Sequence, residues 1–178
     1  MGFVPSKRKG LLWEDAKRLN ETILKCPFNT TGKDEKAFEM GFSTTLVKDQ
    51  DSFNNDIRAQ ILKSSKVESI YCFGKKHRPD LAIDEDGIAI EIKLIDYEGL
   101  KHAIGQGFVY RLKYKFVFLI LIIEEKKKDF YEDLAGGKEK DLEDLLTHLS
   151  EKMNIFTYIV PNFNIVKLGM KKNVSFFK

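Results

Sequence analysis

Two short stretches of alternating apolar and polar residues lie next to each other near the middle of the chain. In residues 80–84, Asp-Leu-Ala-Ile-Asp, and in residues 88–94, Ile-Ala-Ile-Glu-Ile-Lys-Leu, every second residue is a large aliphatic one. This period of two is typical of a β-strand that buries one face. The residues between the stretches, Asp-Glu-Asp-Gly at 84–87, favour a turn. We therefore predict a β-hairpin over residues 80–94.

The predicted hairpin places three charged side chains, those of Asp80, Glu91 and Lys93, on the face opposite the aliphatic residues. A loop at residues 85–86 would set Asp80 directly opposite Glu91. A loop at residues 86–87 would set Asp80 opposite Lys93, with Glu91 one diagonal step away. Both loops have an even length, so both registers keep the three charges on one face. A loop of three residues would separate them.

Two carboxylates held close together repel each other unless a cation lies between them. Carboxylate oxygens suit Mg²⁺ or Mn²⁺, which keep several waters and bind substrate phosphate. A lysine two residues from one carboxylate can hold the attacking water or balance charge in the transition state. The alternative is a surface strand on which Glu91 and Lys93 form an ordinary ion pair.

The period changes after Lys93. Residues 97–113 have apolar side chains near helical spacing, although three glycines interrupt them, and His102, Gln106 and Tyr110 would share one helical face. Residues 116–123 are all apolar, which predicts a strand buried on both faces and is too short to cross a membrane. A strand, a helix and a buried strand in this order predict an α/β fold with a mixed sheet.

The remaining segments are assigned by the same periods. We predict helices at 11–25, 51–64 and 139–153 and a core strand at 154–160. The stripe of the second helix would be Phe53, Ile57 and Ile61. Residues 36–48 stay ambiguous, and the tail at 162–178 fits either an edge strand or a basic arm.

In these motifs the chain resembles the PD-(D/E)xK nuclease superfamily, which has the restriction-endonuclease-like fold. Pro79-Asp80 followed by Glu91-Ile92-Lys93 matches the signature of that superfamily. Gln106 and Tyr110 are similar to the QxxxY element of RecB-type exonuclease domains. The resemblance covers about residues 50–160 and implies a three-layer α/β/α domain with a central mixed sheet. Residues 1–48 would then be a helical extension and residues 162–178 a basic tail of a single domain spanning 1–178.

The resemblance also implies roles for these residues. Asp80, Glu91 and the main-chain carbonyl of Ile92 would bind Mg²⁺ or Mn²⁺, and Lys93 would position the nucleophilic water. Gln106 would help to hold the active site, and Tyr110 would lie near the nucleic-acid backbone.

A third acidic ligand is harder to assign. The superfamily often takes one, most commonly a glutamate, from a helix before the first core strand. The predicted helix at 51–64 contains no glutamate, so we place Asp56 first and keep Asp51 or Gln60 as alternatives.

Composition and charge fit one soluble domain that binds nucleic acid but do not demand it. The chain has 178 residues, 43% of them hydrophobic, and a formal net charge of only +3. Basic residues cluster at 7–9, 75–78, 126–128 and 171–172. Lys75, Lys76 and Arg78 precede Asp80 and are expected to draw phosphates towards it. Acidic neighbours make 126–128 a solvated loop instead.

Cys26 and Cys72 are too few for a cysteine-ligated metal cluster or a disulfide framework. Free thiols without a signal peptide lead us to expect a cytoplasmic protein that is not bound to a membrane.

The expected function is that of a Mg²⁺-dependent deoxyribonuclease, with RNA as the alternative substrate. Exonuclease, restriction-type endonuclease and junction resolvase activities stay open, and the resemblance is compatible with a homodimer. A non-catalytic nucleic-acid-binding module of the same fold and an interaction domain with a coincidental motif are the alternatives.

Overall fold

The structure is a computed structural model that describes residues 3–4, 6–26, 28, 34–59, 66–163 and 174–178. Its helices are α1 (Leu11–Lys25), α2 (Glu35–Lys48), α3 (Tyr97–Tyr110), α4 (Lys128–Ala135) and α5 (Lys140–Met153). Its strands are β1 (Ile57–Ala59), β2 (Ile70–Cys72), β3 (Lys75–His77), β4 (Leu81–Ile83), β5 (Ile88–Leu94), β6 (Phe116–Ile123), β7 (Ile155–Pro161) and β8 (Val174–Phe176).

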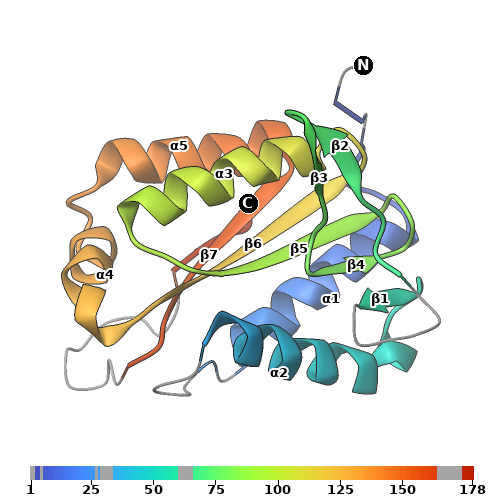
Figure 1. Cartoon of the computed structure of the whole chain (residues 1–178), viewed down its shortest axis with the longest axis horizontal. Helices are drawn as coiled ribbons and strands as arrows, with labels where there is room; N and C mark the ends of the chain where they lie inside the picture. The colour runs from blue at the N-terminus through green and yellow to red at the C-terminus, as the bar shows by residue number, and fades with distance from the viewer. Residues whose placement is uncertain (1–2, 5, 27, 29–33, 60–65, 164–173) are drawn as a thin grey trace.

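Six strands form a mixed sheet in the order β1-β4-β5-β6-β7-β8, and β2 and β3 form a separate hairpin (Figure 1). The central pairs β5–β6 and β6–β7 are parallel. The pairs β1–β4, β4–β5 and β7–β8 towards the edges are antiparallel. Helix α3 connects β5 to the parallel strand β6, as a crossover connection requires. The structure confirms the α/β class with a mixed central sheet.

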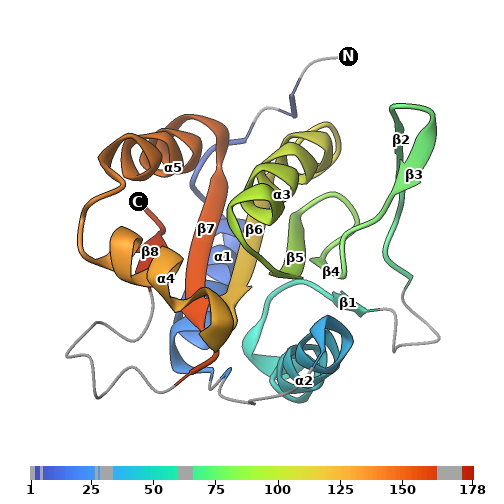
Figure 2. The same cartoon turned by 60° about the vertical axis from the view of Figure 1, so that its left-hand side comes forward.

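Helices cover both faces of this sheet (Figure 2). On one face, apolar residues of α1 and α2 pack against alternate residues of the central strands such as Ile90, Phe118 and Phe156. On the other face, residues of α3, α4 and α5 pack against the intervening positions such as Ala89 and Leu119. The strand β6 is buried along its whole length because both of its faces lie inside the protein.

Several predicted elements are confirmed. The helices at 11–25 and 140–153 and the strands at 116–123 and 155–161 have nearly the predicted bounds. The helix predicted at 97–113 ends earlier, at Tyr110. The ambiguous segment at 36–48 belongs to a helix, α2. Residues 174–176 form an edge strand, β8, which favours the strand alternative for that part of the tail, while residues 164–173 lie outside the described residues.

Two expectations about the first third of the chain were wrong. Residues 57–59 form strand β1, not part of a helix, because Ile57 and Ala59 bury their side chains while the backbone pairs with β4. Ile61 and the rest of 60–65 lie outside the described residues. In addition, α1 and α2 are not an extension beside the core. They supply the layer that covers one face of the sheet, with Leu19, Phe42 and Leu46 fully or almost fully buried.

No helix in the described part of the chain has the length and apolar character that spanning a membrane would need.

The turn that joins β4 to β5 is tightly packed. The carbonyl of Gly87 accepts hydrogen bonds from the N–H groups of Lys115 and Phe116 at 2.9 and 3.0 Å, which fixes the turn to the start of β6. A Cβ atom on Gly87 would lie 2.6 Å from the carbonyl oxygen of Ile83 and 2.7 Å from Cδ1 of Leu12. The turn therefore has no room for a side chain.

We predict that Gly87→Ala lowers the free energy of unfolding by about 1–3 kcal/mol, because backbone atoms must move to admit the methyl group. Urea denaturation would measure the loss. Gly105→Ala is the control: Gly105 lies in α3 with open space around its Cβ position, so the helix should gain roughly 0.5–1 kcal/mol. Equal effects of the two substitutions would contradict the tight packing of the turn as the cause.

Candidate active site

The strand β5 is longer than the antiparallel partner beside it. Only Ile88, Ala89 and Ile90 pair with β4, so the last four residues of β5 continue along an open edge of the sheet. The backbone N–H groups that point to this edge need other acceptors. The N–H of Ile92 donates to Oδ2 of Asp80 at 2.7 Å, and the N–H of Leu94 donates to Oε2 of Glu35 at 3.1 Å. Two carboxylates thus accept the hydrogen bonds that a neighbouring strand would otherwise accept.

The register of the hairpin is the first of the two that the sequence allowed. Leu81 pairs with Ile90 and Ile83 with Ile88, which brings Asp80 beside Glu91. The side chains of Ile88, Ile90 and Ile92 enter the core beneath α1 and α2. Glu91 and Lys93 therefore lie on the opposite face, as the parity of the strand predicted.

Glu91 is the centre of the cluster. Its side chain is almost completely buried, with 1% of the residue exposed. Oε2 accepts a hydrogen bond of 2.7 Å from the hydroxyl of Tyr110, and Oε1 lies 3.1 Å from Nζ of Lys93. The carboxylate is therefore held by α3 on one side and by its own strand on the other.

Lys93 joins Glu91 to a second carboxylate, Glu35, which was not among the residues predicted for the site. Its Nζ atom donates to Oε1 of Glu35 at 2.9 Å. Glu35 is the first residue of α2, which Asp34 caps by accepting a hydrogen bond from the N–H of Ala37 at 2.9 Å. The cap followed by apolar residues at helical spacing could have indicated this helix. Its contact with β5 could not be read from the sequence.

The electrostatics of the cluster are those of crowded carboxylates. Burial, and next the charge of Glu91, raise the pKa of Asp80 to about 7, although the hydrogen bond from Ile92 and the charge of Lys93 oppose this rise. Glu39, also on α2, adds to it. Burial likewise raises the pKa of Glu91, against the effect of Lys93. Burial lowers the pKa of Lys93, but Glu91, Glu35 and Asp80 raise it by more, so the ammonium stays charged.

The donor set fits a hard divalent cation by its chemistry. Asp80, Glu91 and Glu35 offer carboxylate oxygens, and a cation near them would relieve the repulsion that raises the pKa of Asp80. Continuing the register of the hairpin would bring Pro79 opposite Ile92, and proline has no N–H to donate to the Ile92 carbonyl. Within the described residues, however, no three His, Cys, Asp or Glu side chains already form a group that could hold a metal ion.

Asp56 does not belong to this cluster. It is exposed, and its carbonyl accepts a hydrogen bond of 2.8 Å from the N–H of Asp84 at the turn end of the hairpin. Asp80 lies at the opposite end of β4, four residues away, or about 13 Å at the rise of a strand. The choice of Asp56 failed because residues 57–59 pair as a strand and carry Asp56 away from the site. Asp51, in a 3-10 turn, is exposed as well.

The positions of Gln106 and Tyr110 are exchanged relative to the prediction, in which Gln106 holds the site and Tyr110 lies near the nucleic acid. Tyr110 is completely buried and donates to Glu91, so it holds a carboxylate of the candidate site and is closed to solvent. Gln106 is half-buried and lines an open hollow between α3 and the β2–β3 hairpin. The difference arises because the last turn of α3, with Tyr110, packs on the sheet, whereas the outer side of the helix, with Gln106, faces the hollow.

Lys75, Lys76 and Arg78 are exposed on and just after β3, in a hairpin that was not predicted from the sequence. The basic pair at 171–172 lies outside the described residues.

Comparisons of the chain with protein-family models, with curated proteins and with solved structures found no match. A function for this chain must therefore be argued from the geometry of the site.

We predict that Asp80→Asn stabilises the metal-free protein at pH 8 and has little effect at pH 4. A carboxyl whose pKa is raised to about 7 by folding binds a proton more tightly in the folded state. The free energy of unfolding of the unsubstituted protein therefore falls as the pH rises from about 4 to about 7. Removing the charge should return roughly 1–3 kcal/mol at pH 8.

Urea denaturation in EDTA at both pH values would measure this effect. Asp56→Asn serves as the control, since Asp56 is an exposed aspartate just before β1, beside the turn of the β4–β5 hairpin. If Asp80→Asn changed stability equally at pH 4 and pH 8, the raised pKa of Asp80, which burial and the charge of Glu91 cause, would not explain the effect.

Proposed function

We propose that this protein is a metal-dependent nuclease that hydrolyses phosphodiester bonds, with DNA as the expected substrate. One observation carries the proposal: the open edge of the sheet brings Asp80, Glu91 and Lys93 together on one face. The cluster differs from an ordinary surface ion pair, because Glu91 is buried and Lys93 bridges two carboxylates. The resemblance to the PD-(D/E)xK superfamily and its restriction-endonuclease-like fold supports the same function.

In this proposal Asp80, Glu91 and the Ile92 carbonyl hold Mg²⁺ or Mn²⁺. The ion would neutralise the carboxylates and polarise the phosphate. Lys93 holds the attacking water or balances the charge that develops on the phosphate oxygens. Tyr110 keeps Glu91 in place through the hydrogen bond of 2.7 Å to Oε2. Glu35 replaces Asp56 as the candidate for the third acid, because it comes from a helix and already contacts Lys93.

We predict that Glu91→Gln and Lys93→Met each lower Mn²⁺-dependent cleavage at least about 100-fold without preventing folding. Cleavage should be measured on a panel of linear, circular, single-stranded and four-way-junction DNA, with folding checked by circular dichroism. Glu14→Gln and Lys17→Met are the matched controls, since these two residues form an exposed ion pair on α1. They should leave cleavage unchanged.

The substrate panel also separates the activities that the site allows. Cutting of circular DNA would exclude a pure exonuclease, and preference for the four-way junction would favour a resolvase. Cleavage that survives Glu91→Gln would come from a contaminant or another site and would refute the proposal.

A binding module with an impaired metal site is the second candidate. It is favoured by one observation: the ammonium of Lys93 already pairs with both Glu91 and Glu35 and so takes part of the place of a metal ion. Such a module would bind DNA but would cut none of the panel in Mg²⁺ or Mn²⁺. A domain with neither activity would instead belong to the interaction class.

We predict that Glu35→Gln raises the Mn²⁺ concentration needed for half-maximal cleavage about tenfold. The substitution keeps an oxygen for the N–H of Leu94 but removes the charge beside Lys93. Glu39→Gln is the comparison on the same helix, one turn further on, and should have a smaller effect because Glu39 acts on Asp80 only through its charge. A larger effect of Glu39→Gln would make Glu39 the third acid.

A further inference from the structure

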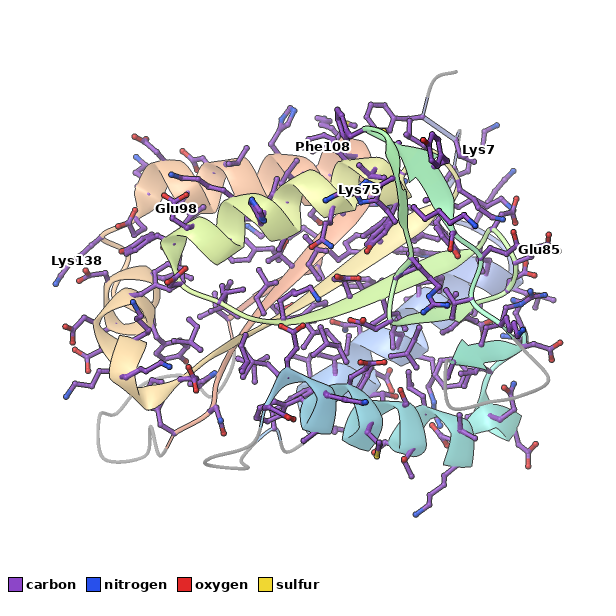
Figure 3. The ribbon with its side chains drawn as sticks, in the orientation of Figure 1. Lys7, Lys75, Glu85, Glu98, Phe108 and Lys138 are labelled. Carbon is purple, nitrogen blue, oxygen red and sulfur yellow. The ribbon has the colours of Figure 1, made fainter. Side chains whose placement is uncertain are left out.

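The β2–β3 hairpin stands beside α3 (Figure 2). Side chains of the hairpin and of α3 line a hollow between them. The hollow has a volume of about 940 Å³ and includes Lys93 in its lining, so it is continuous with the candidate active site. Figure 3 shows Lys75 on the hairpin and Phe108 on α3 at this end of the molecule. Both residues belong to the lining.

The hairpin is anchored at its base and presents one face to the hollow. Ile70 packs on the core, and the ammonium of Lys113 lies 3.0 Å from the carboxylate of Glu68 just before β2. Because Cys72 pairs with Lys75, these two residues share one face of the hairpin, which lines the hollow. The base therefore holds the inner face towards α3.

The tip of the hairpin is an unusual two-residue turn. Phe73 and Gly74 both have positive φ, 50° and 74°, as a type I′ turn requires. Asparagine and glycine suit such a turn, whereas a bulky side chain is strained at its first position. Phe73 is nevertheless 84% exposed and lines the hollow, with its ring in an edge contact with His77 at 6.5 Å between centroids. The turn thus gives up stability to hold an aromatic ring in solvent, which is a mark of a functional position.

The residues that line the hollow indicate which kind of ligand Phe73 contacts. Its described lining residues include three lysines and two histidines and contain no aspartate or glutamate. Lys93 pairs with Glu91 and Glu35, and Lys101 pairs with Glu98 at 2.7 Å. Lys75 makes no ion pair with any residue that the structure describes, so it is the lysine left to meet a phosphate. The rings of Phe3 and Phe108 lie 6.0 Å apart in the same lining. Cations and aromatic rings lining one groove are the pattern with which proteins hold single strands of nucleic acid.

We propose that the hollow binds an unpaired segment of a nucleic-acid strand, with a base stacked on Phe73 and phosphates near Lys75, and leads that strand to Lys93. This inference rests on the proposed function and narrows its substrate to strands that are single-stranded, frayed or branched next to the cut. Inside a duplex the base faces are covered by their stacked neighbours and only the terminal pairs expose one, so a duplex binds mainly by phosphate contacts.

The test measures binding without cleavage. Labelled dT12, U12 and a 12-base-pair duplex are titrated with the protein in EDTA at low salt, and binding is followed by fluorescence anisotropy. We expect the single strands to bind more tightly than the duplex, and the ratio of dT12 to U12 affinity decides between DNA and RNA. Wild-type protein that binds neither single strand, or binds the duplex equally well, would overturn the inference.

The decisive variant is Phe73→Asn. Asparagine suits the turn better, so the urea midpoint should stay the same or rise, while affinity for the single strand falls about tenfold through the loss of one stacked base. Phe73→Trp should keep the affinity, and its added tryptophan fluorescence should be quenched by the bound strand. Leu145→Ala, at another exposed apolar residue, is the control without effect. Unchanged single-strand affinity in Phe73→Asn would refute the stacking contact.

The two proposals can fail separately. If cleavage depends on Glu91 but Phe73 has no role in binding, the nuclease function is supported and the proposed binding of a single strand in the hollow is refuted. If single-strand binding depends on Phe73 but the protein cuts no substrate in Mn²⁺, the proposed binding site is supported and the nuclease function is refuted.

Discussion

The candidate site depends on one constraint: β5 extends four residues beyond its antiparallel partner β4. The backbone N–H groups at that edge have no partner strand and need other acceptors, which here are side chains. Asp80 and Glu35 supply them from opposite directions, one from the chain just before β4 and one from the first turn of α2. The backbone requirement therefore gathers carboxylates around Glu91. The position of these charges follows from the four residues of β5 that have no antiparallel partner.

This arrangement is costly for the protein without a metal ion. Burial raises the pKa values of Asp80 and Glu91, and neighbouring carboxylates add to it, Glu91 for Asp80 and Glu35 for Glu91. A single ammonium, that of Lys93, lies between Glu91 and Glu35. Buried like charges destabilise a fold unless something binds them, and a structural role alone would be filled better by neutral side chains. Sites that keep such a cost usually use it for catalysis or binding. The cost of the cluster thus favours a nuclease over an interaction domain.

Local periodicity was enough to predict the hairpin and the common face of Asp80, Glu91 and Lys93, because strand parity and an even loop depend only on nearby residues. It was not enough for Glu35, which reaches Lys93 across 58 positions through the packing of α2 on the sheet. The spacing of Phe53 and Ile57 fits a helix, yet pairing with β4 makes Ile57 part of a strand. Tertiary contacts decided both cases. The β2–β3 hairpin was missed because its turn, at residues 73–74, has Phe73 at the first position, where asparagine or glycine is usual, and only Gly74 fits the pattern.

Helix α3 connects the two proposed parts of the site. Near its end, Tyr110 points into the core and holds Glu91. Its outer side, with Gln106 and Phe108, lines the hollow under the β2–β3 hairpin. A strand held in the hollow would therefore contact the same rigid helix that orients the buried carboxylate. Because both contacts belong to one helix, the element that positions Glu91 would also position the phosphate that reaches Lys93. A nuclease needs this coupling between substrate binding and cleavage.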